Sequence, residues 1–186
     1  VEKARNLYLD AVQGYLDAGD LTSGSRSLRS VKTLQNEYQL NPTPRAVALE
    51  TVLETKIEAK RIPEIGANTG ANLIRQLDRD DVQQALPEAY LQRQRVDVLT
   101  DLSARAYRTG KTDTAEAIRE EAWNTAVQAP GVTATQVRKV LTAPENTKRR
   151  TMSMQTRKPS AQPRRADQLV DIQDLQKTRE AQSANP

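Results

Sequence analysis

The sequence predicts an all-α protein with about three antiparallel helical hairpins, arranged as an array or a closed bundle. Three observations support this fold class. Apolar residues recur every three or four positions along most of residues 1–142, which is the spacing of one helix face. Aromatic residues make up only 3% of the chain, and phenylalanine is absent. A core filled mainly by Ala, Leu, Val and Ile suits thin helical layers better than a sheet sandwich rich in aromatic side chains.

The first predicted hairpin covers residues 4–40. Gly19 suits a left-handed helix cap, and Asp20 or Thr22 suits the N-cap of the second helix. Pro42 and Pro44 then end the hairpin, because proline lacks the backbone N–H and disfavours a helical residue before it. The residues with helical spacing are Leu7, Ala11, Val12, Tyr15, Leu16, Leu28, Val31, Leu34 and Tyr38.

The second predicted hairpin covers residues 45–86 and has its turn at residues 61–63. Gly66 and Gly70 weaken its descending helix by about 1 kcal/mol each relative to alanine. These small residues indicate either a poor helix held by its neighbours or a close contact between helices. The acidic residues of 78–81 are expected to form a helix end or N-cap, since no glycine-turned loop of the calcium-binding kind follows them.

The third predicted hairpin begins at Pro87, turns at residues 109–113 and ends at residues 130–131. A short helix over 133–141, with Thr133 as its N-cap, is expected to cover the end of the stack. We expect Trp123 and Tyr107 to pack inside this hairpin. The alternative is that they form an exposed aromatic anchor for a partner.

The positive charge of the chain is concentrated in one segment. Residues 1–142 contain 19 basic and 19 acidic residues, whereas residues 143–165 contain seven basic residues and one acidic residue. This segment is rich in Pro, Ser, Thr and Gln, and it has too few apolar residues to offset the entropy cost of folding. It is predicted to be a disordered basic linker. The residues that make it a possible contact for nucleic acid or another anion are Lys148, Arg149, Arg150, Arg157, Lys158, Arg164 and Arg165.

The last segment, residues 166–186, regains helical spacing and is predicted to be a short amphipathic docking helix with a tail. Its polar side is acidic, so it does not suit a membrane surface. It is too short to be stable alone. We expect its apolar face to dock either on its own stack or on a neighbouring subunit; that face consists of Leu169, Val170, Ile172 and Leu175.

The chemistry available to this chain is narrow because it has no histidine and no cysteine. Imidazole is the side chain that titrates near neutral pH, and cysteine is the usual thiolate nucleophile or soft metal ligand. No carboxylate, lysine, tyrosine or serine pattern of catalytic spacing replaces them. The sequence therefore predicts a protein that is not an enzyme, with no catalytic, cofactor-binding or metal-binding residues and no cofactor.

Two of the turns share a pattern that resembles a known repeat. Residues 15–20 and 106–111 each place an aromatic residue shortly before a glycine, and a small residue, Gly24 or Ala115, follows that glycine five positions later. This pattern resembles the tetratricopeptide repeat, with Tyr8 and Tyr15 at its large positions in the first unit. The units here are longer than the family's roughly 34 residues, and the middle hairpin lacks the pattern. The resemblance implies a concave groove that grips a helix or extended peptide of a partner.

From these features we expect a non-enzymatic scaffold or adaptor that makes protein–protein contacts with a partner or neighbouring subunits in a larger assembly. The alternative is a structural component of a viral or phage nucleoprotein particle, in which the basic segment contacts nucleic acid. No apolar run reaches the roughly 18 residues of a membrane span. The chain is thus expected to be soluble and not inserted in a membrane, and a cytoplasmic or particle location is favoured.

Overall fold

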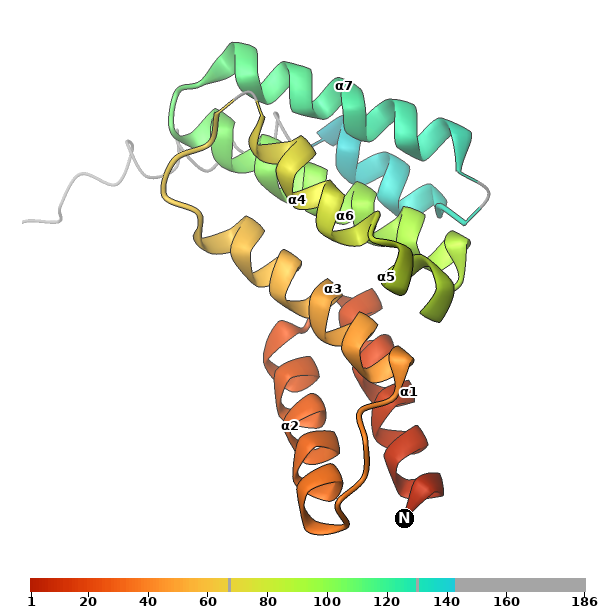
Figure 1. Ribbon diagram of the computed structural model, residues 1–186. Helices are drawn as coiled ribbons and strands as arrows, with labels where there is room; N and C mark the ends of the chain where they lie inside the picture. The colour runs from red at the N-terminus through yellow and green to blue at the C-terminus, as the bar shows by residue number, and fades with distance from the viewer. Residues whose placement is uncertain (67, 130, 143–186) are drawn as a thin grey trace, which may run out of the picture. The chain divides into compact units, whose positions relative to one another are not determined.

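The computed structural model describes residues 1–66, 68–129 and 131–142. In this part of the chain all secondary-structure elements are helices, which are connected by turns and loops (Figure 1). The basic linker predicted for 143–165 and the docking helix predicted for 166–186 lie outside the described residues. The labelled helices of this part are α1 (Glu2–Ala18), α2 (Leu21–Glu37), α3 (Pro44–Arg61), α4 (Thr69–Leu77), α5 (Asp80–Ala85), α6 (Glu88–Arg108) and α7 (Thr112–Gln128). A further helical segment covers 134–142 and is called the terminal helix below.

The first hairpin is confirmed as the antiparallel pair α1 and α2. Gly19 has a φ of 75°, and its backbone N–H donates to the carbonyl of Leu16 at 3.1 Å. Asp20 caps α2 because its carboxylate accepts the backbone N–H of Ser23 at 3.0 Å. Not all residues with helical spacing are buried: Leu7, Tyr15 and Tyr38 are exposed, whereas the core positions of the pair are Leu9, Val12, Leu16, Leu28 and Val31.

Helix α3 occupies the centre of the described part. It begins where the prolines predict, with Pro44 in its first turn. Thr43 is the N-cap, and its hydroxyl oxygen accepts the backbone N–H of Ala46 at 3.2 Å. It packs against α1, α2, α4, α5 and α6. Because neighbours surround it, its buried residues are not confined to one narrow stripe; they are Ala46, Ala48, Leu49, Val52, Leu53, Thr55, Lys56 and Ala59.

The descending half of the second hairpin differs from the single helix expected. It is divided into α4 and α5, and the chain is extended at Arg79. The acidic residues mark this break as predicted, because Asp78 ends α4 and Asp80 and Asp81 lie in the first turn of α5. The positive end of the α5 helix dipole stabilises the two carboxylates in that turn. Gly70 supports the close-contact interpretation, because a Cβ there would lie 3.2 Å from the Leu99 side chain.

The third hairpin is confirmed as α6 and α7, with Gly110 at a φ of 77° in the turn. The terminal helix is also confirmed within one residue of the predicted range. Thr133 and Gln136 form a capping box: the backbone N–H of Gln136 donates to Thr133 Oγ1 at 3.3 Å, and that of Thr133 donates to Gln136 Oε1 at 3.1 Å.

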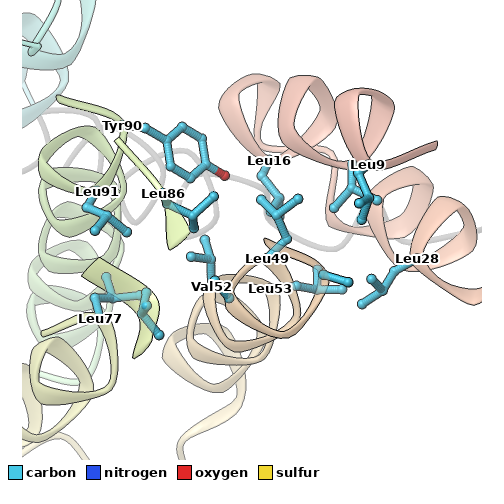
Figure 2. Close-up of a cluster of buried hydrophobic side chains, with 14 of the residues drawn as sticks. Leu9, Leu16, Leu28, Leu49, Val52, Leu53, Leu77, Leu86, Tyr90 and Leu91 are labelled. Atoms are coloured by element: carbon cyan, nitrogen blue, oxygen red, sulfur yellow. The ribbon is translucent and has the colours of Figure 1, made fainter. Parts of the chain in front are cut away.

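Two groups of buried apolar residues hold the helices together. The first core cluster joins α1, α2, α3, the end of α4 and α5 to the first turns of α6, and Figure 2 shows Leu16, Leu49 and Tyr90 within it. The second core cluster joins the end of α3, α4, α6, α7 and the terminal helix, and includes Leu99. Ile74 packs against both clusters. None of the described helices is both long and apolar enough to span a membrane.

Candidate protein-docking site

Trp123 is not where the sequence analysis placed it. The residues of α7 that enter the core are Ala115, Ile118, Ala122 and Ala126. Trp123 follows Ala122, and one residue further along a helix lies about 100° further around it. The indole is consequently 37% exposed, so the prediction of a buried Trp123 was wrong, and the alternative of an exposed aromatic residue fits the structure. Tyr107 is half-buried against the second core cluster, and its hydroxyl donates to Glu116.

Trp123 lines a groove of about 340 Å³ between α7 and the terminal helix. Val140 and Leu141 of the terminal helix also line it; Leu141 is 51% exposed, whereas Val140 is buried in the second core cluster. Charged residues complete the lining: Glu116, Arg119 and Glu120. Arg119 forms an ion pair with Glu116 at 2.6 Å. This Trp123 groove therefore combines an accessible apolar surface with charged edges, which is the composition of many protein-docking surfaces.

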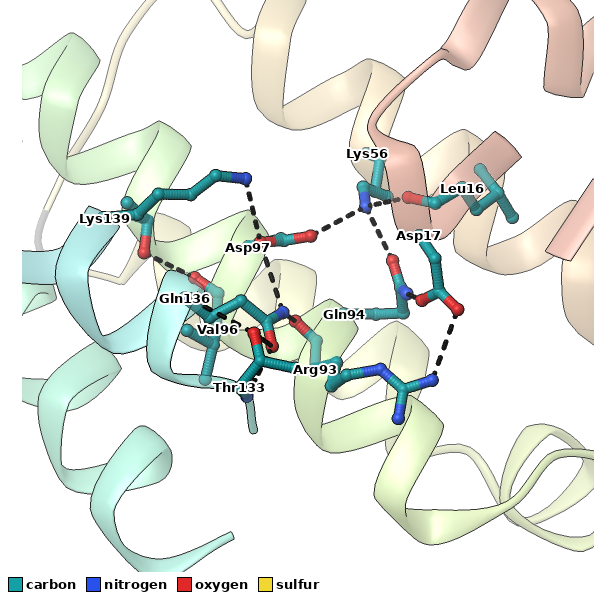
Figure 3. A network of polar contacts seen from close by, with 11 residues as sticks. Leu16, Asp17, Lys56, Arg93, Gln94, Val96, Asp97, Thr133, Gln136 and Lys139 are labelled. Carbon is teal, nitrogen blue, oxygen red and sulfur yellow. Dashed lines mark hydrogen bonds and ion pairs between the residues drawn. The ribbon is translucent and has the colours of Figure 1, made fainter. Parts of the chain in front are cut away.

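A polar network fixes the terminal helix, and thereby one wall of the groove, to α6 (Figure 3). The side-chain amide of Gln136 donates to the carbonyl of Arg93 at 3.1 Å and to Asp97 Oδ1 at 3.4 Å. The Lys139 ammonium lies 3.8 Å from the same carboxylate oxygen. The terminal helix thus has specific polar contacts in addition to the apolar contact of Val140.

The same network continues from Asp97 into the first hairpin. The Lys56 ammonium pairs with Asp97 Oδ2 at 3.3 Å, and it donates to Gln94 Oε1 at 2.6 Å and to the carbonyl of Leu16 at 2.9 Å. Gln94 in turn donates to Asp17 at 2.8 Å. The network therefore connects the end of α1, the middle of α3, α6 and the terminal helix (Figure 3).

Lys56 has a structural role in this arrangement. Burial lowers the pKa of its ammonium group, and the nearby carboxylate of Asp97 opposes that shift. An ammonium group has three N–H donors. The three acceptors are Leu16, Gln94 and Asp97, so the donors are used to hold helices together.

The residues that the sequence analysis assigned to the docking helix and to the basic linker lie outside the described residues. They are Leu169, Val170, Ile172 and Leu175 for docking, and Lys148, Arg149, Arg150, Arg157, Lys158, Arg164 and Arg165 for anion contact. The groove residues Val140 and Leu141 were not expected to line a site. The sequence pattern that could have indicated a groove was a pair of apolar side chains at the end of a short helix. The same pattern is equally expected of residues that pack into a core.

Comparison with known proteins gives no relative from which a site can be transferred. No protein-family model matches the chain, and neither a curated protein nor a solved structure shows significant similarity to it.

Proposed function

We propose that this chain is a non-enzymatic scaffold or adaptor subunit that holds a partner protein within a larger assembly. The observation that carries the proposal is the Trp123 groove, which is lined by an accessible indole and by the exposed side chain of Leu141. Tryptophan is among the residues most enriched at the energetic centres of protein interfaces, because it buries a large rigid surface.

The dimensions and lining of the groove suit the apolar face of a short amphipathic helix. Its volume of about 340 Å³ accommodates a few side chains and not a whole domain. Helix-in-groove recognition uses aliphatic anchors that recur along one helix face. Residues 166–186 of this chain have such a pattern in Leu169, Val170, Ile172 and Leu175, and we propose a helix of this chemistry as the occupant.

The finer fold proposal is a tetratricopeptide-like array. Two antiparallel pairs, α1 with α2 and α6 with α7, support it, and so does Gly24, where a Cβ would lie 3.7 Å from the Leu16 side chain. The middle unit departs from such an array because its second helix is divided into α4 and α5. The array would present helix surfaces to a partner, as helical repeat proteins do.

A fluorescence titration tests the docking proposal. The receptor is the full-length chain with Leu169, Val170, Ile172 and Leu175 replaced by serine, so that its own segment does not compete. The probe is a synthetic peptide of residues 166–186, which contains no tryptophan, so Trp123 reports alone. We expect a saturable blue shift of the indole emission, and affinity at least roughly tenfold lower when Leu141→Glu places a charge in the groove.

The matched control is Val127→Glu. Val127 lies on the same helix, is 61% exposed and does not line the groove, so this variant should bind the peptide as the parent does. Equal affinity of the Leu141→Glu and Val127→Glu variants would reject the Trp123 groove as the docking site.

A second candidate function, a structural component of a viral or phage nucleoprotein particle, is favoured by the charge distribution. Residues 1–142 are balanced in charge, and the seven basic residues of 143–165 oppose one acidic residue. The test compares binding of the full-length chain to generic duplex DNA and single-stranded RNA over a salt series, with and without replacement of those seven residues by glutamine. Seven phosphate contacts predict a log–log salt slope of about −5 to −6, and equally weak binding by both proteins would contradict this function.

A further inference from the structure

A larger groove, of about 950 Å³, opens between α4, α5, α6 and α7. Four carboxylates line it: Asp78 at the end of α4, Glu88 in α6, and Glu120 and Glu121 in α7. We call it the acidic groove. It shares Glu120 with the Trp123 groove but is otherwise a separate surface.

The negative charge of this groove is largely uncompensated. Arg95 is the single basic residue in its lining, and its two terminal nitrogens are already bound to Asp78 at 2.5 Å and to Glu88 at 2.9 Å. Glu120 and Glu121 form no ion pair with any residue of the described part. Partial burial raises the pKa of Glu121. Two carboxylates of the groove are thus available to a cationic partner.

The remaining lining favours an extended polypeptide as that partner. Four side-chain amides line the groove, from Gln83, Gln92, Asn124 and Gln128, and that of Gln92 already donates to Glu88. An amide side chain both donates and accepts, so it matches the alternating N–H and C=O groups of a backbone. Carboxylates for basic side chains and amides for the main chain together suit a Lys- and Arg-rich segment.

The chain itself contains a segment of this chemistry. Seven of its basic residues and only one acidic residue fall within 143–165, whereas residues 1–142 have as many acidic as basic residues. We propose that the acidic groove of one copy binds the basic segment 143–165 of a second copy, so that copies associate head to tail. Such a contact joins two different surfaces and allows further copies to add, which is a property that an assembly scaffold needs.

The direction in which the terminal helix runs relative to α7 favours a second copy as the source of the basic segment 143–165. Val140 and Leu141, near the end of the described part, lie beside Glu116 and Arg119 in the first half of α7. The acidic groove begins at the same level of α7, with Ala117 and Glu120, and extends to Gln128 and Ala129 at the other end of that helix. To fill the groove, the chain's own segment would have to reverse direction after the terminal helix and follow α7 again, whereas a segment from a second copy can enter from either end.

Two full-length variants provide the test. The molar mass of each protein is measured by sedimentation over a range of protein concentrations. The groove variant carries Glu120→Gln and Glu121→Gln. The segment variant carries glutamine at all seven basic positions of 143–165. We expect the wild-type chain to associate as concentration rises and to dissociate when salt is raised from about 50 mM to about 500 mM, because salt screens exposed charges. Each variant alone should associate roughly tenfold or more weakly, because each loses charges that the contact would pair.

Mixing the two variants separates this mechanism from general charge effects. The segment variant retains an intact groove and the groove variant an intact segment, so the mixture should form 1:1 heterodimers that do not grow further. A control with Glu54→Gln and Glu58→Gln, two exposed positions of α3 outside the groove, should associate as the wild type does. The proposal is overturned if all proteins and the mixture stay monomeric, as they would if the segment bound within its own chain, or if the groove variant matches the control.

This inference depends on the acidic groove and not on the Trp123 groove. If the peptide fails to dock beside Trp123 but head-to-tail association is intact, only the Trp123 groove is rejected as a binding site. If the peptide docks but association is absent, only the acidic groove is rejected.

Discussion

Lys56 is the most buried charged residue of the described part, with only 3% of its surface exposed. An isolated ammonium group in such a place would be strongly destabilising. Here its cost is offset by the Asp97 carboxylate and by two neutral acceptors, Gln94 and the Leu16 carbonyl. Removal of one member therefore leaves the others buried without their partner.

We predict that Lys56→Met lowers the free energy of unfolding by about 3–5 kcal/mol, the usual cost of removing one partner of a buried ion pair. Urea denaturation followed by far-UV circular dichroism measures this change. Lys60→Met, at an exposed position one turn further along α3, is the control and should change stability by less than about 0.5 kcal/mol. A Lys56→Met protein as stable as the wild type would show that the network adds nothing to stability.

Asp101 should make stability depend on pH. Burial raises its pKa above the ordinary aspartate value, while Lys60, Lys56 and Lys139 lower it and Asp97 adds to the rise. The folded state therefore holds this proton more tightly than the unfolded state. The resulting stabilisation is complete below the unfolded-state pKa and is lost as the pH rises through the folded-state pKa.

Relative to Asp101→Asn, the wild-type chain should consequently lose stability as the pH rises from below the ordinary aspartate pKa of about 3.9 toward neutral pH. Melting temperatures of both proteins over this range measure the difference. A wild-type advantage that increases with pH would contradict the prediction, since it would mean that Asp101 is more easily ionised in the folded state.

At the scale of elements, a glycine inside α1 and the glycine at its C-cap have opposite effects on the helix. Gly14 lies inside the helix, and a Cβ there would meet no atom within 4 Å. Gly19 ends the helix at a φ of 75°, a conformation that side chains with a Cβ rarely adopt. The same residue type therefore weakens α1 at one position and terminates it at the other.

We predict that Gly14→Ala stabilises the protein by about 1 kcal/mol, because alanine is the better helix former. Gly19→Ala should destabilise it by about 1–2 kcal/mol, because the left-handed conformation crowds a Cβ against the carbonyl oxygen. Urea denaturation of the two variants gives both values, and each serves as the other's control. Equal effects of the same sign would contradict the assignment of Gly19 as a strained helix cap.

At the scale of the whole described part, two core clusters are joined by α3, by Ile74 and by the Lys56 network. Leu49 is fully buried in the first cluster and Leu99 nearly so in the second. Because the clusters share these connections, loss of packing in one should weaken both.

We predict that Leu49→Ala and Leu99→Ala each lower the free energy of unfolding by about 2–5 kcal/mol. Each variant should still unfold in a single transition. Circular dichroism follows all helices, whereas the single tryptophan, Trp123, follows α7. Val127→Ala, at an exposed site of α7, is the control and should behave as the wild type. Separate circular dichroism and fluorescence transitions in either core variant would show that the two clusters unfold independently.

The sequence by itself determined the first and third helical hairpins, the glycine turns at residues 19 and 110, the proline-limited start of α3 and the short helix capped by Thr133. These features depend on residues close together in the chain: a cap, a turn or a spacing of three and four. The local signal was weaker at Trp123, because the alanines beside it make almost any face of α7 look equally apolar. The neighbouring acidic residues at 78–81 marked a helix end, but they did not reveal that α4 and α5 would be separate helices.

Only the tertiary structure decided how Lys56 is satisfied, that Trp123 is exposed, and which side chains line the two grooves. Lys56 bonds to the Leu16 carbonyl 40 residues away, and Gln94 bonds to Asp17 77 residues away. The Trp123 groove likewise requires α7 and the terminal helix to lie together. The physical reason is that burial and pairing depend on the packing of distant segments, whereas caps and turns depend on the conformation of a few consecutive residues.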